Sequence, residues 1–105
     1  MSVNKAILLG YVGADPEMRY PEKDKPIAFV SLATNETNNA GMETTEWHKL
    51  VFLGDLANLA ERYIRKGTQI YVEGKITTRE YEDRMKIVRK RTEIIVSFFE
   101  ILGRK

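Results

Sequence analysis

The 105-residue chain contains no cysteine and only one histidine, His48. The absence of cysteine excludes a disulfide framework, thiol catalysis and cysteine-ligated zinc, and a lone histidine cannot form a histidine cluster. No stretch reaches the roughly 20 apolar residues that a membrane-spanning helix needs, and the N-terminus lacks the apolar region of a signal peptide. The sequence therefore predicts a soluble, cytoplasmic protein with no metal site and no cofactor.

Motifs of common enzyme classes are also missing. The chain contains no glycine-rich phosphate-binding loop, no nucleophile elbow and no pair of histidines, so the sequence predicts that the protein is not an enzyme. A chain of 105 residues has room for one domain with a core of moderate size. We therefore expect a single domain over residues 1–105.

Charge is unevenly distributed along the chain. The net charge of +2 is too small to predict a polyanionic partner by itself. However, residues 1–44 carry four basic and six acidic groups, a sum of −2, whereas residues 45–105 carry thirteen basic and nine acidic groups, a sum of +4. Any anionic partner is therefore expected to bind the second part of the chain.

Alternation of apolar and polar residues predicts five strands, over residues 3–12, 27–35, 45–53, 68–81 and 92–102. Residues 14–26 contain all three prolines and are expected to form an irregular loop with a short extended piece at 18–20. Residues 82–91 contain five basic side chains and are expected to form the tip and return of a long β-hairpin.

The period changes to 3.6 residues after the third expected strand, which predicts one short helix. Four apolar residues at i, i+3, i+4 and i+7 form its buried stripe: Leu56, Leu59, Ala60 and Tyr63. Asp55 is placed to cap the helix at its N-terminus, and Gly67 is placed to end it.

This element order predicts the fold. Five strands, with one helix between the third and fourth and a long β-hairpin between the fourth and fifth, are the arrangement of an OB-fold. The OB-fold is an all-β, five-stranded Greek-key barrel that binds oligonucleotides or oligosaccharides. The alternative is another small β-barrel that uses the same pattern for packing alone.

Two expected strands carry aromatic and basic side chains on one face. Alternation groups Trp47, Lys49, Val51 and Leu53 on the strand over 45–53. It also groups a second set on the strand over 68–81: Gln69, Tyr71, Glu73, Lys75, Thr77, Arg79 and Tyr81. Rings that stack on bases, interleaved with cations that compensate phosphates, are what single-stranded nucleic acid requires. Taken alone, Trp47 also fits a core position, and the basic hairpin also fits a solvated turn.

Five segments of the chain carry a family resemblance: VNKAILLGYVGADPEMRY, SLATNET, TEWHKLVF, LAERYIRKGTQIYVEGKI and TTREY. In order and spacing they resemble the bacterial single-stranded DNA-binding protein (SSB) family, from Val3 to about Gly103. The resemblance implies an OB-fold that binds and protects single-stranded DNA without sequence preference in replication, recombination and repair. It also implies a location in the bacterial cytoplasm, associated with the nucleoid.

The resemblance implies stacking at particular positions. Trp47 matches a tryptophan of the family that stacks on bases, and Tyr81 matches the aromatic residue after the T-x-R motif. Leu53 and Asn38 stand where the family has two further rings, so we expect weaker stacking than in fully aromatic relatives. Basic residues are expected to compensate by binding phosphates: Lys49, Lys66, Arg79, Arg84, Lys86, Arg89, Lys90 and Arg91. Binding should therefore depend strongly on salt concentration.

The resemblance also implies self-association, because the family forms dimers that usually pair into tetramers. His48 matches a histidine at a subunit contact. Glu100 stands where an amide is common, so a second carboxylate near Glu73 would need Lys5 or a proton. Tyr71 fits either packing or a subunit contact. The expected interface residues are Lys5, His48, Gln69, Tyr71, Glu73 and Glu100.

Family members normally end in a flexible tail whose acidic tip recruits replication and repair enzymes. The sequence stops at Lys105 without such a tip, so we expect a short member that lacks this route to replication proteins. The alternative interpretation is a primosome-like, plasmid or phage accessory OB protein that acts mainly through protein partners. RNA binding stays open, because stacking accepts both polymers.

Overall fold

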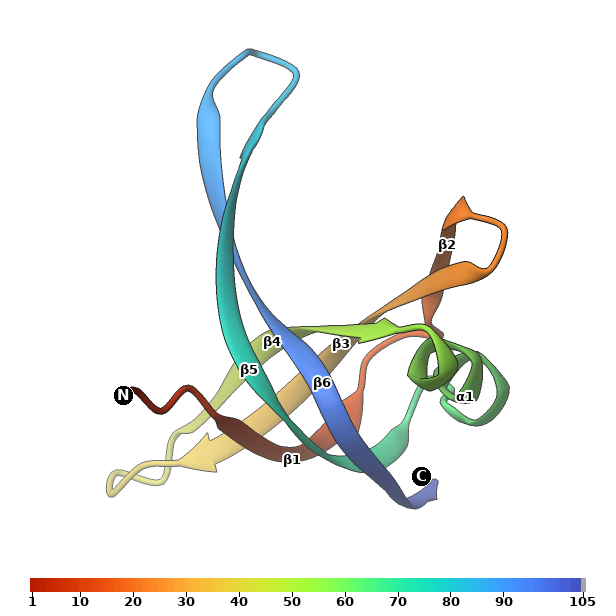
Figure 1. Cartoon of the computed structure of the whole chain (residues 1–105). Coiled ribbons are helices and arrows are strands. Elements are labelled where there is room, and N and C mark those ends of the chain that lie inside the picture. Colours follow the sequence, from red (N-terminus) through yellow and green to blue (C-terminus); the bar gives the residue numbers. More distant parts are fainter. Residues whose placement is uncertain (105) are drawn as a thin grey trace.

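Strands of alternating apolar residues build most of the computed structural model, which describes residues 1–104 (Figure 1). The elements in chain order are β1 (Ala6–Val12), β2 (Glu17–Glu22), β3 (Lys25–Thr37), β4 (Glu43–Leu53), α1 (Asp55–Tyr63), β5 (Thr68–Glu82) and β6 (Val88–Arg104). The five predicted strands and the predicted helix are present, and β5 and β6 form the predicted long hairpin.

Strand pairing closes the sheet into a barrel. The hydrogen-bonded order is β1-β5-β6-β4-β3-β2, and β1 also pairs with β3 at Tyr11↔Ala33. β4 and β6 are parallel at Leu50↔Ile94, whereas the other neighbouring strands are antiparallel. A closed five-stranded barrel with its helix between β4 and β5 is the predicted OB-fold.

A sixth strand, β2, occupies part of the segment for which the prolines predict an irregular loop. It pairs with β3 from Glu17↔Phe29 to Arg19↔Ile27. β2 has one strand neighbour only, and Pro21 follows the regular part of this pairing. An edge strand tolerates proline because one side of its backbone needs no partner. The loop prediction is therefore wrong for residues 17–22, and only the extended piece within it is confirmed.

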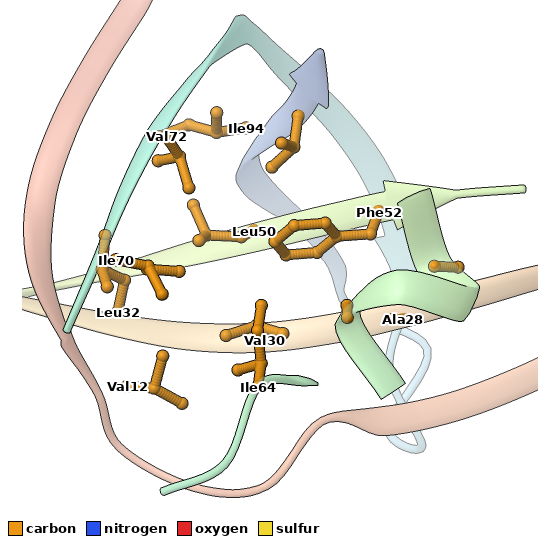
Figure 2. Close-up of a cluster of buried hydrophobic side chains, with 13 residues drawn as sticks. Val12, Ala28, Val30, Leu32, Leu50, Phe52, Ile64, Ile70, Val72 and Ile94 are labelled. Carbon is orange, nitrogen blue, oxygen red and sulfur yellow. The ribbon is translucent and has the colours of Figure 1, made fainter. Parts of the chain in front are cut away.

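Aliphatic side chains fill the barrel. Figure 2 shows side chains of β3, β4, β5 and β6 pointing into one interior. Phe52 of β4 is the largest of the fully buried side chains. The Phe52 ring packs edge-on against Phe99, with 5.2 Å between ring centroids. The buried cluster comprises Val12, Ala28, Val30, Leu32, Leu50, Phe52, Ala57, Ala60, Ile64, Ile70, Val72, Ile94 and Val96.

α1 closes one end of the barrel with small side chains. Ala57, Ala60 and the following Ile64 are fully buried, whereas Leu59 and Tyr63 are 42% and 45% exposed. The predicted stripe is therefore wrong at Leu59 and Tyr63, because two alanines let the helix lie close to the strands it covers. Among the described residues, no helix is long and apolar enough to cross a membrane.

The predicted ends of α1 also differ from the structure. Gly54 is the N-cap residue and no side chain caps the helix, so the capping role of Asp55 is wrong. The helix ends at Tyr63 because Ile64 is extended, with φ −94° and ψ 131°. Ile64 can then turn into the barrel, three residues before Gly67.

Residues 77–92 of β5 and β6 leave the barrel as a two-stranded arm (Figure 1). A Cβ atom at Gly74, just before the arm, would lie 2.3 Å from the carbonyl oxygen of Ile95, so the hairpin bends where only glycine fits. At the tip, the Asp83 carboxylate accepts hydrogen bonds from the backbone N–H groups of Met85 and Ile87. The arm therefore ends in an ordered turn.

Candidate nucleic-acid interface

Trp47 on β4 and Tyr81 on the arm line the same open cavity, which has a volume of about 400 Å³. Its lining includes the cations Lys49, Lys90 and Arg91 and no carboxylate of the described residues. We call it the cationic cavity. The fold thus brings together three residues that alternation grouped on two separate strands, Trp47, Lys49 and Tyr81, and two cations of the predicted basic hairpin, Lys90 and Arg91. The complete lining is Trp47, His48, Lys49, Tyr81, Lys90, Arg91, Thr92 and Ile94.

Both rings of the cationic cavity are open to solvent. The exposed fraction is 60% for Trp47 and 41% for Tyr81, so the core position that a lone tryptophan could occupy is excluded. A Cβ atom at Gly13 would lie 2.5 Å from the indole ring. Glycine at this position therefore gives the indole room to rest against the chain just after β1.

Two arginines that face each other across the arm turn in opposite directions. Arg79 and Arg91 are direct cross-strand neighbours, an arrangement that like charges disfavour. The Arg91 guanidinium lies 4.9 Å from the centroid of the Tyr81 ring, which is a cation–π contact. The Arg79 Nε instead lies 3.0 Å from Glu93 Oε1, and Glu93 is 4% exposed. The charge of Arg79 is thus already balanced within the protein.

A second cavity of about 630 Å³ lies between β2 and the base of the arm. We call it the hairpin groove. Arg19, Tyr20 and Pro21 line one side, the arm lines the other, and Phe29 of β3 contributes to the lining between them. The sequence did not predict this groove, because residues 14–26 were interpreted as a loop and Phe29, on a predicted strand, was given a structural role. The signals for Tyr20 and Phe29 were the tyrosine that ends the DPE-x-RY run and the alternation in residues 27–31.

The tip of the arm carries three of the predicted phosphate contacts outside both cavities. Arg84 and Lys86 are exposed, and Lys86 has a φ of 62°, a left-handed conformation that favours glycine. Arg89 Nε donates to the Asp83 carboxylate at 2.9 Å. This contact, followed by the backbone N–H of Ile87, lowers the pKa of Asp83.

Two further predicted DNA contacts also lie outside both cavities. Leu53 is 47% exposed at the far end of β4, about 20 Å from Trp47 at the rise of an extended strand. The Lys66 side chain is exposed between α1 and β5, and its backbone N–H donates to the Asp15 carboxylate at 2.9 Å.

The outer side of β1, β5 and β6 presents an outer apolar face. Cross-strand registers place Ile7 opposite Glu73, Leu9 opposite Tyr71 and Tyr11 opposite Gln69. Cross-strand partners share a face of the sheet. β6 adds Phe98 and Glu100, which lie opposite Glu73 and Tyr71. Apolar residues of this face are well exposed, including Ile7 at 57%, Leu9 at 51% and Phe98 at 44%.

Two of the charged side chains on the outer apolar face, Lys5 and Glu73, pair with each other. Lys5 Nζ lies 3.3 Å from Glu73 Oε1, and the Tyr71 hydroxyl donates to the other oxygen of Glu73. The hydrogen bond from Tyr71, followed by the contact with Lys5, lowers the pKa of Glu73.

The structure brings five of the six predicted interface residues to this face or its edge: Lys5, Gln69, Tyr71, Glu73 and Glu100. The sixth, His48, lies on β4, where its Nε2 and the Thr34 Oγ1 share a hydrogen bond of 2.9 Å. Among the described residues, no group of three or more histidine, aspartate or glutamate side chains could hold a metal ion.

Comparison with known proteins agrees with this geometry. A model of the single-strand binding protein family matches residues 3–102. Single-stranded DNA-binding protein 1 of Xylella fastidiosa (strain 9a5c) is 41% identical over 109 residues, which cover 99% of this chain and 80% of that protein. The structure of a Plasmodium falciparum SSB complex with single-stranded DNA matches with a TM-score of 0.87 and 31% identity, covering 100% of this chain and 97% of that chain. The chain therefore belongs to the single-strand binding protein family, whose members bind single-stranded DNA and are not enzymes.

Proposed function

We propose that the cationic cavity is where this family member holds single-stranded DNA. Bases stack on Trp47 and Tyr81, and Lys49, Lys90 and Arg91 bind the phosphates. One observation carries the proposal: two exposed rings share a cavity with three cations and no carboxylate among the described residues. Stacking needs only the flat face of a base, so binding is independent of sequence. Such binding serves DNA replication, recombination and repair, in the bacterial cytoplasm at the nucleoid.

Intrinsic fluorescence tests this site directly, because Trp47 is the only tryptophan. Titration with oligothymidine at low salt should quench the emission, since the indole stacks on bases. Saturable binding measured by a labelled oligonucleotide, without any change in Trp47 emission, would place the DNA elsewhere on the protein.

We propose that the remaining predicted cations bind phosphates of the DNA that lies outside the cationic cavity. Arg84 and Lys86 at the tip, and Lys66 beside Asp15, are exposed cations within reach of solvent. Arg79 and Arg89 are already paired with carboxylates, so they contribute mainly by holding the arm in shape. Leu53 offers an apolar contact without a stacking ring.

We also infer that copies of the chain associate through the outer apolar face, as a dimer and then a tetramer. The support is a continuous set of exposed apolar side chains on three neighbouring strands, in which Lys5 and Glu73 are already paired. Mass measured in solution, with and without long oligothymidine, tests the inference. A monomer that binds a replication protein through this face would instead favour an accessory role in which protein partners dominate.

A further inference from the structure

The cationic cavity and the hairpin groove meet at two cations. Lys49 on β4 and Arg91 on the arm line both of them. Figure 1 shows the β2–β3 hairpin and the arm standing on the same side of the barrel, and the groove lies between β2 and the base of the arm. A polymer that occupies the cationic cavity therefore has a continuous way past Lys49 and Arg91 into the groove.

The chemistry of the hairpin groove differs from that of the cationic cavity. Its lining holds four cations and three carboxylates, and each carboxylate already has a partner within the protein. Glu17 pairs with Arg19, Glu93 pairs with Arg79, and Asp15 accepts the Lys66 backbone N–H. The groove therefore offers a polyanion little net attraction, but it also presents no unpaired carboxylate of the described residues.

The hairpin groove instead offers rings. Tyr20 is 54% exposed, and Phe29, which lies opposite Glu17 on the neighbouring strand, is half-buried. The Tyr20 hydroxyl donates to the Glu61 carboxylate of α1 at 3.2 Å. This hydrogen bond fixes the ring without covering it, and a ring that is already ordered loses less entropy when a ligand stacks on it.

We propose that a DNA strand leaving the cationic cavity passes Lys49 and Arg91 and enters the hairpin groove, where a base stacks on Tyr20. Tyr20 is thus a third stacking residue on this chain, supplied by a strand at the sheet edge. The inference rests on the proposed function, since it extends the strand held at Trp47 and Tyr81. Because the groove is nearly balanced in charge, the added affinity comes from stacking and adds little salt dependence.

Strand length separates the two cavities experimentally. An oligothymidine of about 5 nucleotides should fill only the cationic cavity, whereas one of about 15 nucleotides also reaches the groove, within the range that OB-folds accommodate. For Tyr20→Ala we expect affinity for the longer strand to fall between about 5-fold and about 150-fold, the range for loss of one stacked base. Affinity for the shorter strand and quenching of Trp47 should not change.

Two further variants make the experiment specific. Tyr63→Ala removes a tyrosine of similar exposure from α1, where it lines neither cavity, and it should leave both affinities unchanged. Tyr20→Phe keeps the ring and should retain most of the affinity for the longer strand. Equal losses for both lengths, or no loss in Tyr20→Ala, would overturn the inference. Failure of the proposed function would look different, because Trp47 of the unaltered protein would not be quenched by either strand.

Discussion

Strand β5 carries two tyrosines ten residues apart on the same side-chain parity, Tyr71 and Tyr81. Their surroundings differ. Tyr71 donates to Glu73 and lies edge-on to Phe98, with 6.3 Å between ring centroids, among aliphatic side chains of β1. Tyr81 lies on the arm, beneath the Arg91 guanidinium, in the cationic cavity. One strand therefore contributes a tyrosine to each of two surfaces.

The comparison shows that an exposed ring does not by itself indicate nucleic-acid binding. The state of the neighbouring charges distinguishes the two surfaces. Lys5 beside Tyr71 is paired with Glu73, whereas the three cations that line the cationic cavity with Tyr81 have no carboxylate partner within 4 Å among the described residues. An apolar surface with paired charges suits another protein surface, and a ring with unpaired cations suits a polyanion.

The largest expected effect comes from placing a charge on the outer apolar face. Leu9→Glu would bury an unpaired carboxylate in any contact between copies, which is strongly unfavourable. We expect the mass in solution to fall to that of the 12.1 kDa monomer, with quenching of Trp47 by a short oligonucleotide retained. Leu59→Glu on α1 is the matched control, since Leu59 is similarly exposed but lies on another surface. An unchanged mass in Leu9→Glu would exclude this face as the interface.

A pair of ring deletions tests the division of roles. Trp47→Ala should weaken binding of a short labelled oligothymidine by about 1–3 kcal/mol, because one stacked base loses its partner. Phe98→Ala removes an exposed ring from the outer apolar face and should leave this affinity unchanged. Fluorescence anisotropy measures both without using the tryptophan. Similar losses in the two variants would mean that the two surfaces are not functionally distinct.

Salt dependence tests the contrast between paired and unpaired cations. Lys90→Gln should reduce the magnitude of the slope of log K against log salt by about 0.7, the value for one phosphate of a single strand. Lys5→Gln removes an equal charge that Glu73 already balances, so the slope should stay the same. Titrations at several salt concentrations measure both slopes, and an equal decrease in the two variants would show that position on the protein does not matter.

The sequence was most informative where a local pattern determines the result. Alternation correctly placed the barrel strands, and it brought Trp47, Lys49 and Tyr81 to one surface from two segments far apart in the chain. It was less informative where the outcome depends on a partner strand. β2 forms because β3 offers an edge, and Arg79 turns to Glu93 on the opposite strand. Neither contact can be recognised from the alternation of apolar and polar residues within its own segment.

The α1 prediction shows the same limit. The hydrophobicity pattern predicts that Leu59 and Tyr63 are buried. In the structure, Ala57 and Ala60 are the helix residues buried against the end of the barrel. Close approach between a helix and a sheet depends on the shape of both, which a single segment does not contain. Leu53 and Lys66, which the sequence groups with the DNA contacts, line neither the cavity that holds Trp47 nor the hairpin groove, so their role stays a prediction.

The smallest expected effect concerns pH and the paired charges of the outer apolar face. Glu73 has a pKa below its ordinary 4.5, chiefly through the hydrogen bond from Tyr71 and then through Lys5, so its contribution to stability is lost as the pH falls through the lowered pKa. The same hydrogen bond, followed by desolvation and the charges of Glu73 and Glu100, raises the pKa of Tyr71 above 10.0, so the contribution is lost again as the pH rises through the raised value.

The stability difference between the unaltered protein and Glu73→Gln should therefore be level between these limits and shrink on both sides of them. Unfolding temperatures between about pH 3 and about pH 11 measure it. The effect is small because Lys5 and Glu73 are partly exposed, so solvent screens their interaction. Tyr71→Phe is the control, because it removes the alkaline limb and leaves the acid limb to Lys5 and Glu73. If the stability difference does not depend on pH, the interactions of Glu73 with Lys5 and Tyr71 do not contribute to stability. The outer apolar face would then be stabilised by apolar packing alone.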